Sequence, residues 1–392
     1  MNMRQVYLDY SATTPVKKEV LDEMLPYFSE KFGNPSSLYA IGLQAKADIN
    51  KARSQVAAAI GASEREIYFT SSGTEADNWA LNGVARGNKS KGNHIITTGI
   101  EHHAVLNTCK ALEKEGFEVT YLDVDNKGRV NPADVEKAIT DKTILISIMF
   151  INNEIGTIQP IKEIGEIAKK YQVLFHVDAV QALGNVPIDV KDLGIDLLAI
   201  SAHKIYGPKG VGALYIRRGV VIPSYITGGA QENNKRSGTE NTPGIIGFGK
   251  AAELAHNNLE EHIKHVSSLR DYFTKEILSR IPDVDINGDM EHRHPGNINF
   301  VFNYAEGEAI LLYMDAKGIF ASTGSACSSS SFTPSHVLRA LGLSADKTYS
   351  SVRFTIGDFT TKEDIDYAVE EITKIVEKLR SFSPFNKERK MV

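Results

Sequence analysis

The sequence predicts an α/β protein with a large domain, built on a mostly parallel sheet of seven strands, and a small α+β domain. Three observations support this prediction. The chain has 392 residues, which is more than one simple core accommodates. Short apolar segments alternate with amphipathic helical patterns between about residues 60 and 220, and the pattern changes after residue 280. We therefore expect the large domain over residues 14–257 and the small domain over residues 1–13 and 258–392.

Seven apolar segments in the first part of the chain have the length and composition of strands. They cover residues 67–70, 94–98, 119–123, 143–151, 173–177, 197–201 and 213–216. Helical patterns lie between several of them, for example at residues 104–115 and 161–171. Strands and helices that alternate in this way form parallel sheets with both faces covered. Ligands bind such sheets beyond the carboxyl ends of the strands, so a site is expected there.

The second part of the chain has a different pattern. A long helical segment at residues 243–280 is expected to connect the two domains. Beyond it we expect strands at residues 297–302 and 351–356, and helices at residues 306–317, 334–341 and 362–379. A helix is also expected near the start of the chain, at residues 16–31, and we expect it to pack with the small domain.

Composition narrows the classes of function. A net charge of −5 favours neither nucleic acid nor an anionic membrane as a partner. The first residues contain no apolar signal core, and the most apolar stretch, residues 144–151, is far shorter than a membrane span. The two cysteines, Cys109 and Cys327, have no spaced His/Cys cluster around them, so neither a disulfide nor a structural metal site is expected. A reducing, cytoplasmic location is expected.

The strongest local signal is the segment Ser201-Ala-His-Lys204, which directly follows an apolar strand. A lysine at a strand end inside a cleft can lose its proton and form a Schiff base with an aldehyde. The alternative is a solvated lysine before a turn, which is the usual state of lysine.

A carboxylate supports the reactive interpretation of this lysine. Asp178 ends the preceding apolar strand, 26 residues before Lys204, and this separation suits two strands of one sheet joined by a crossover. A carboxylate facing a pyridine nitrogen keeps that nitrogen protonated, so that the ring can accept electrons from a substrate. The alternative role for Asp178 is a helix N-cap.

Two further segments lie between a strand and a helix. Residues 70–78, TSSGTEADN, are small and hydroxylic, which leaves backbone N–H groups free to bind a phosphate at a helix N-terminus. Glu101-His102-His103 supplies an imidazole that could stack on a flat ring or move a proton. Helix capping explains either segment equally well when it is taken alone.

These four segments together resemble those of the fold-type I pyridoxal-phosphate (PLP) enzymes, and most closely those of the cysteine desulfurases in the class V aminotransferase branch. The matching segments are residues 7–15, 33–37, 70–78, 101–102, 152–156, 178–181, 201–204, 236–241 and 324–328. They run nearly from end to end in the order and spacing of the family. The resemblance implies the same fold-type I architecture and PLP as the cofactor.

The resemblance also assigns roles to individual residues. It implies that Lys204 carries the cofactor and moves the substrate proton, that Asp178 pairs with the pyridine nitrogen, and that His102 stacks on the ring. Arg353 is expected to bind the substrate carboxylate through bidentate hydrogen bonds. Further contacts to the cofactor are implied for Asn153, which also contacts the substrate, and for Gln181, Gly73, Thr74, Ser201 and His203. Thr239 is expected to reach the phosphate from the second subunit of a homodimer.

One departure from the family concerns the phosphate segment. Ser72 stands where many relatives have a glycine. Serine is still small, so PLP binding is expected, but which side chain touches the phosphate is left open.

The two cysteines have different surroundings. Cys109 shares an apolar face at helical spacing with residues 105, 106 and 112, and we expect it to be buried and structural. Cys327 lies in residues 322–331, STGSACSSSS, which have no apolar periodicity and are typical of an exposed loop. A cysteine that can become a thiolate is a nucleophile, so Cys327 is the candidate.

The resemblance implies conversion of L-cysteine to L-alanine, with the sulfur passed to Cys327 as a persulfide. The stretch from residue 327 to 334 matches the longer-loop group of the family, whose members supply sulfur to scaffold proteins for iron–sulfur cluster assembly and to tRNA thiolation. A selenocysteine lyase, an aminotransferase and a non-catalytic scaffold of the same fold stay open as alternatives. The identity of the sulfur acceptor, and a transient role of Cys327 in holding an iron–sulfur cluster, are open too.

Overall fold

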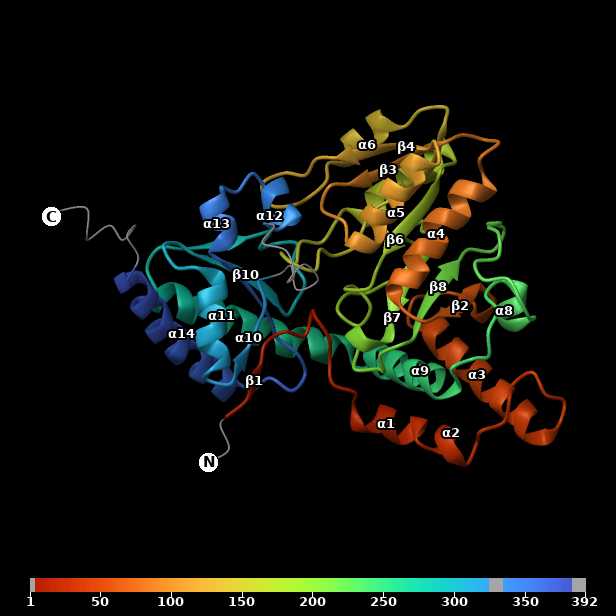
Figure 1. The fold of residues 1–392 in the computed structure, drawn as a ribbon, viewed down its shortest axis with the longest axis horizontal. Helices are drawn as coiled ribbons and strands as arrows, with labels where there is room; N and C mark the ends of the chain where they lie inside the picture. Colours follow the sequence, from red (N-terminus) through yellow and green to blue (C-terminus); the bar gives the residue numbers. More distant parts are fainter. Residues whose placement is uncertain (1–3, 324–333, 383–392) are drawn as a thin grey trace.

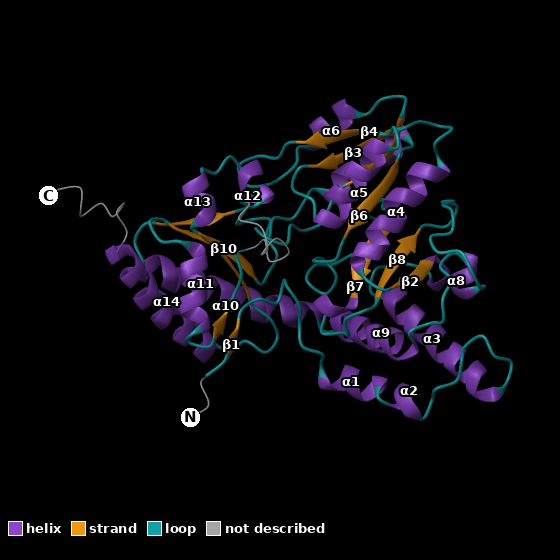
Figure 2. Ribbon diagram, in the orientation of Figure 1, coloured by secondary structure: helices purple, strands orange, loops and turns teal. Residues whose placement is uncertain are grey.

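A computed structural model describes residues 4–323 and 334–382 of the chain. Its largest element is a sheet of seven strands, which are parallel except for β8 (Figures 1 and 2). In spatial order the strands are β2 (Ile67–Thr70), β8 (Gly212–Ile216), β7 (Leu197–Ser201), β6 (Leu174–Asp178), β5 (Thr143–Ser147), β3 (His94–Thr98) and β4 (Glu118–Leu122). The predicted fold class is confirmed, and each expected strand is present within a few residues of its expected ends.

Helices cover both faces of this sheet (Figure 2). One face is covered by α4 (Gly73–Gly87) and α5 (His103–Lys114), and the other by α3 (Ala40–Ala58), α6 (Pro132–Ala138), α7 (Ile161–Tyr171) and α9 (Thr242–Asn257). Neighbouring residues of a strand enter different cores, as Leu197 and Leu198 do, because successive side chains point to opposite faces. Burial on both faces explains why these strands are continuous apolar runs.

The remaining part of the chain has its own core. An antiparallel sheet in the order β12 (Ser351–Thr355), β10 (Asn297–Phe302) and β9 (Val284–Asn287) packs with the helices α10 (Leu259–Arg280), α11 (Gly307–Asp315) and α14 (Lys362–Phe382). The first strand, β1 (Val6–Tyr7), pairs in parallel with β11 (Ile319–Phe320). Short helices α12 (His336–Ala340) and α13 (Ala345–Tyr349) complete this region. The two separate cores are the physical basis for the two-domain division that we propose.

Two expectations for helices were wrong. The helix expected at residues 16–31 is split by Pro26 into α1 (Lys18–Met24) and α2 (Pro26–Ser29). It does not pack with the small domain, because Val20, Met24 and Tyr27 join the core under the seven-stranded sheet and pack with α9. The long helix expected at residues 243–280 is interrupted at Asn258, which separates α9 from α10.

Candidate active site

A cavity of about 420 Å³ lies at the carboxyl ends of the parallel strands. It lies where the sequence predicted a site, because the ends of β5, β6 and β7 meet at one edge of the sheet. The predicted site residues that line it are Gly73, Thr74, His102, Asn153, Asp178, Gln181, Ser201, His203, Lys204 and Arg353. The fold thus brings together side chains that are up to 280 positions apart in the sequence.

Lys204 lies in the short turn η2 (Ala202–Lys204), directly after β7. Its ammonium group donates hydrogen bonds to the backbone oxygens of Ser11 and Ala12, the latter at 2.8 Å. The turn is held by the backbone N–H of Gly207, which donates to the oxygen of Ala202. Lys204 is therefore anchored at a strand end and points into the cavity, rather than lying in solvent.

Asp178 is the last residue of β6 and is buried. Its Oδ1 accepts the backbone N–H of Val180 at 3.0 Å, so it caps a turn, although no helix begins there. Burial raises the pKa of Asp178, while His102 and Lys204 act in the opposite direction. A carboxylate that faces these two groups can stay ionised and hold a proton on a ring nitrogen opposite it.

The N-terminus of α4 forms one wall of the cavity. Ser72 caps this 15-residue helix by accepting the N–H of Glu75 at 3.1 Å, and Gly73 and Thr74 line the cavity. A Cβ atom at Gly73 would lie 2.5 Å from Cγ2 of Val180, so only glycine fits without a shift. The cap leaves other N–H groups at the start of α4 free, and such groups can bind an anion such as a phosphate.

His102 caps a helix and also lies at the cavity. Its Nδ1 accepts the N–H of Ala104 at 3.2 Å and caps α5, and the same ring lines the cavity. Burial lowers the pKa of His102, which favours the neutral ring. With Nδ1 accepting, the proton of the neutral ring is on Nε2.

Arg353 extends from β12 into the cavity and is 2% exposed. Its guanidinium donates to the backbone oxygen of Asn153 at 2.9 Å and to Oδ1 of Asp9 at 2.6 Å. Burial raises the pKa of Asp9, and Arg353 acts against this rise. The guanidinium is therefore held in a fixed orientation that a substrate carboxylate can meet.

Three other predicted residues complete the wall. Nε2 of Gln181 donates to the backbone oxygen of Ser11 at 3.0 Å. Nδ1 of His203 is 3.2 Å from Oγ1 of Thr13, and burial lowers the pKa of His203 to about 4. Ser201 ends β7 beside them. These contacts hold residues 11–13 against the wall of the cavity.

Comparison of the sequence with known protein families identifies the family of this chain. Residues 6–368 match the family model described as aminotransferase class-V. The chain belongs to the class V aminotransferase family. Its members depend on PLP.

Curated relatives of this class V chain carry the name cysteine desulfurase IscS. The protein of Dictyoglomus turgidum is 56% identical over 388 residues, covering 99% of this chain and 98% of the relative. That of Methanosarcina thermophila is 58% identical over 381 residues, covering 97% and 94%. Among solved structures, a NifS-like protein has 39% identity and a TM-score of 0.91, with 96% and 100% of the two chains covered.

A second solved relative bears on the substrate. The structure described as SspA in complex with cysteine has 36% identity and a TM-score of 0.80, and covers 91% of this class V chain and 100% of its own. Both solved relatives align with more than nine tenths of this chain.

One predicted residue does not line the cavity, and another lies outside the described residues. Thr239 is exposed and does not line it, so its predicted contact with a phosphate of another subunit stays a prediction. Cys327, with the stretch up to residue 333, and the basic tail at residues 386–392 lie outside the described residues. Cys109 is buried in α5, as expected, and burial raises the pKa of its thiol to about 12.

The sequence interpretation missed several residues of the site. Asp77, Glu154 and His336 also line the cavity. Asp77 lies within the segment 70–78, and an acidic residue on the buried face of a helix was a signal that could have identified it. Among residues 4–323 and 334–382, no three His, Cys, Asp or Glu side chains are arranged to hold a metal ion, and no helix is long and apolar enough to cross a membrane.

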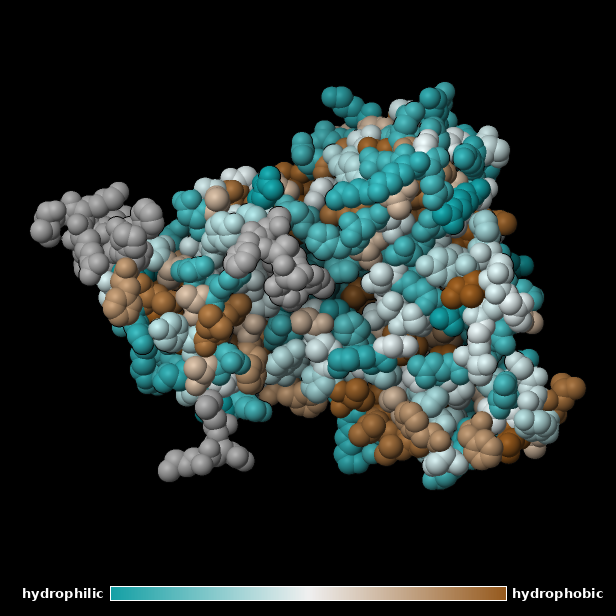
Figure 3. Space-filling model, in the orientation of Figure 1, coloured by the Kyte–Doolittle hydropathy of each residue, from teal (hydrophilic) through white to brown (hydrophobic). Residues whose placement is uncertain are grey.

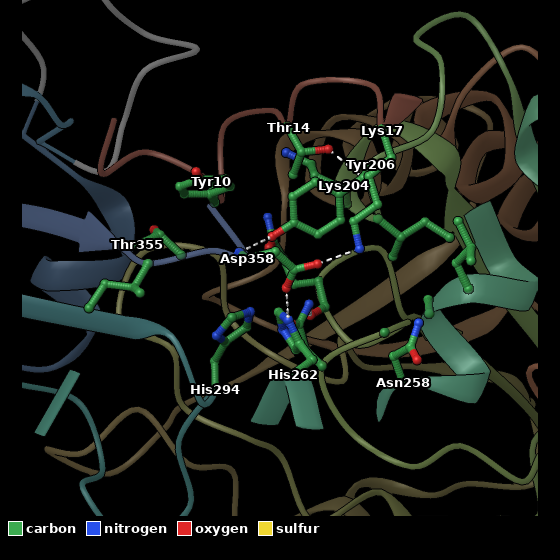
Figure 4. A pocket seen from close by; sticks show the side chains of 17 residues that line it. Tyr10, Thr14, Lys17, Lys204, Tyr206, Asn258, His262, His294, Thr355 and Asp358 are labelled. Atoms are coloured by element: carbon green, nitrogen blue, oxygen red, sulfur yellow. Dashed lines mark hydrogen bonds and ion pairs between the residues drawn. The ribbon is translucent and has the colours of Figure 1, made fainter. Parts of the chain in front are cut away.

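A second, smaller cavity lies behind Lys204, where the two cores meet (Figure 4). Asp358 forms ion pairs there with Lys17, at 2.5 Å, and with His262 of α10. The backbone N–H of Asp358 donates to the hydroxyl of Tyr206 at 2.7 Å. Tyr206 has a φ of +64°, a left-handed backbone conformation that is unusual for a bulky residue. These contacts hold the turn that follows Lys204.

Proposed function

We propose that the protein is a PLP-dependent cysteine desulfurase that converts L-cysteine to L-alanine and transfers the sulfur to Cys327 as a persulfide. One observation carries the proposal. Lys204, Asp178 and the N-terminus of α4 line a single cavity in a chain that is 56–58% identical, over nearly its whole length, to proteins named cysteine desulfurase.

The residues of the cavity fit PLP on physical grounds. The phosphate would take the N–H groups at the start of α4, where the close approach at Gly73 leaves space for no side chain. Asp178 would pair with the ring nitrogen, His102 would stack on the ring, and Lys204 would hold the aldehyde carbon. Ser201, His203, Gln181 and Asn153 would supply further contacts. Bound PLP supplies an electron sink for the bond electrons released at the substrate α-carbon.

The protein's own groups account for the remaining steps. Arg353 orients the substrate by its carboxylate, and Asn153 lies beside it. Lys204 takes the α-proton and later returns a proton to the product. The thiolate of Cys327 attacks the substrate sulfur, so the carbon–sulfur bond breaks while a sulfur–sulfur bond forms. The carbon skeleton leaves as alanine after protonation, and no oxidant or reductant is consumed.

A homodimer is part of the proposal. Large apolar side chains gather on the surface of α1 and α2 and just beyond them (Figure 3). They include Leu25, Phe28, Phe32 and Leu38, which are 53%, 63%, 69% and 90% exposed. Exposed apolar surface of this extent is typical of an interaction site. A second copy of the chain would cover it and could bring Thr239 to the phosphate, as the family pattern implies.

The proposed activity also suggests a physiological role, because the persulfide can pass its sulfur to other proteins. We propose that the persulfide supplies sulfur for iron–sulfur cluster assembly, and for tRNA thiolation, through an acceptor protein in the cytoplasm. The name of the IscS relatives supports a place among the cluster-assembly desulfurases. Selenocysteine lyase activity and a non-catalytic scaffold role are not favoured, because relatives that match nearly the whole chain are named cysteine desulfurase.

A product assay tests the proposal. Purified protein with PLP and L-cysteine should release alanine without any added keto acid, and a thiol should release sulfide. Lys204→Ala should abolish alanine formation and remove the absorbance band of lysine-bound PLP, whereas Lys209→Ala should retain both. Alanine formation that requires a keto acid would indicate an aminotransferase and would contradict the proposal. A protein that remains colourless with added PLP would contradict it too.

A further inference from the structure

A buried group of polar side chains lies directly behind Asp178, on the face of the sheet that α4 covers. His176 precedes Asp178 by two positions on β6, so both side chains point to this face. Ser147 is the partner of His176 across β5 and β6, and Asp77 projects from α4. Asp77 is 1% exposed, and His176 and Ser147 are fully buried. Polar groups at this depth need hydrogen-bond partners.

Two atoms of this group lack such a partner within the described part of the chain, and they face each other. Oδ1 of Asp77 and Nε2 of His176 are both buried and unsatisfied, and they lie 3.4 Å apart. The second ring nitrogen, Nδ1, lies 2.8 Å from Oγ of Ser147. A single proton shared between Asp77 and His176, with a small approach of the two groups, satisfies both atoms.

The position of that proton follows from the charges nearby. Asp77, Glu101 and Asp178 are buried carboxyl groups close enough to influence one another. Burial, Asp178 and Glu101 raise the pKa of Asp77 well above its usual range. Burial raises the pKa of Glu101 to about 8. Like charges in one low-dielectric site do not all ionise, so some of these groups keep their protons.

Asp178 has the surroundings that favour an ionised group. It accepts the N–H of Val180, and His102 and Lys204 favour its charged form. Among residues 4–323 and 334–382, no cationic group lowers the pKa of Asp77 or Glu101 in this way. Burial lowers the pKa of His176 to about 3, so its ring is neutral and Nε2 can accept a hydrogen bond.

We propose that Asp77 is a positioning residue that stays protonated, donates a hydrogen bond from its carboxyl O–H to Nε2 of His176, and thereby leaves Asp178 as the ionised carboxylate of the group. Nδ1–H of His176 then donates to Ser147. This inference deepens the proposed function and rests on it, because it concerns the carboxylate that would face the ring nitrogen of PLP.

The arrangement has a chemical consequence. A second negative charge behind Asp178 would raise the proton affinity of its carboxylate, and the proton shared with the ring nitrogen would move toward Asp178. A neutral Asp77 would avoid this transfer, so Asp178 could keep a proton on the ring nitrogen of bound PLP, where it favours electron uptake by the ring. His176 provides the acceptor that allows a neutral acid to be buried there.

The isosteric substitution Asp77→Asn tests the protonation state. Infrared spectra of the cofactor-free protein at neutral pH should show a carbonyl band of protonated carboxyl groups that is weaker in D77N than in the wild type. The pH midpoint of the absorbance change of bound PLP should be the same in both. An unchanged carboxyl band, with a midpoint shifted by roughly 1–3 units as expected for loss of a nearby charge, would overturn the inference.

Two matched variants separate this inference from the proposed function. Glu101→Gln should also weaken the carboxyl band. Asp178→Asn should leave the band unchanged but weaken PLP binding and shift its absorbance. If D178N binds PLP as the wild type does, the role proposed for Asp178 fails. If D178N behaves as expected and D77N shifts the midpoint, only the role of Asp77 fails.

A measurement on the wild-type protein tests the inference even if D77N fails to fold. Carbon-13 spectra of wild-type protein with labelled aspartate should contain a protonated carboxyl signal at neutral pH. The absence of any such signal would overturn the inference.

Discussion

At the scale of single residues, the site depends on charged side chains that contacts from several elements hold in position. Arg353 is the clearest case. Its guanidinium is buried, yet Asp9 and the backbone oxygen of Asn153 hold it in place and compensate its burial. The same contacts leave it oriented toward the cavity that Lys204 shares.

Substitution of this arginine tests its role in substrate binding. Arg353→Lys keeps the charge but loses the planar fork, so the KM for L-cysteine should rise by about 10- to 100-fold with a smaller change in kcat. Steady-state alanine formation measures both constants. Arg339→Lys, in α12 and outside the cavity wall, is the matched control and should leave both constants unchanged. A KM equal to that of the wild type in R353K would contradict substrate binding by this residue.

At the scale of elements, the start of α4 and the ends of β6 and β7 position the site. Gly73, at the start of α4, packs closely against Val180 in the turn after β6. The sequence predicted both segments, because each has small or charged residues directly after an apolar strand. The Asp77–His176 pair could not be predicted in this way, because its members belong to different elements and meet only through packing of α4 on the sheet.

The Gly73 contact gives a prediction about PLP affinity. Gly73→Ala should weaken PLP binding by about tenfold or more, because the new Cβ would lie 2.5 Å from Cγ2 of Val180 and must displace the start of α4. Val180→Ala combined with Gly73→Ala should recover part of the affinity. Titration of the cofactor-free protein with PLP measures this. Equal losses in the single and double variants would show that the contact is not the cause.

A second prediction concerns the cluster that holds the turn after Lys204. Burial acts to raise the pKa of Asp358, but His262 and Lys17 outweigh it and lower the pKa to about 2. A depressed pKa stabilises the folded state above the unfolded value of about 4, and this stabilisation is lost as the pH falls toward 2. Asp358→Asn should therefore lower stability at pH 7 by roughly 1–3 kcal/mol.

Thermal unfolding of the wild type and D358N measures this effect. The difference between the unfolding midpoints of the two proteins should have its largest value at pH 7 and pH 5, and it should decrease below pH 4. Asp346→Asn, in α13 and away from the cluster, is the control. A constant gap from pH 7 to pH 3 would contradict the role given to the charge of Asp358.

At the scale of the whole molecule, much of the architecture could be predicted from periodicity. Strands buried on both faces are continuous apolar runs, and their positions were predicted within a few residues. The two-residue strands β1 and β11 were not predicted, because two residues carry no pattern. The packing of α1 on α9 was predicted wrongly, since amphipathic spacing shows that a face is buried but not against which partner.

The candidate site was largely predictable, because its residues belong to short segments in a fixed order. What the sequence could not supply were the protonation states, which depend on burial and on neighbouring charges. Cys327 lies outside the described residues, so its proposed role rests on the sequence and on the relatives.

The most direct test of the account is therefore mass spectrometry of the protein after one turnover with L-cysteine. The account predicts the mass of one added sulfur atom on the peptide that contains Cys327, none on the peptide that contains Cys109, and one alanine per active site. Cys327→Ser should lose the persulfide, while Cys109→Ser should retain it. Persulfide on Cys109, or full alanine formation by C327S, would contradict the account.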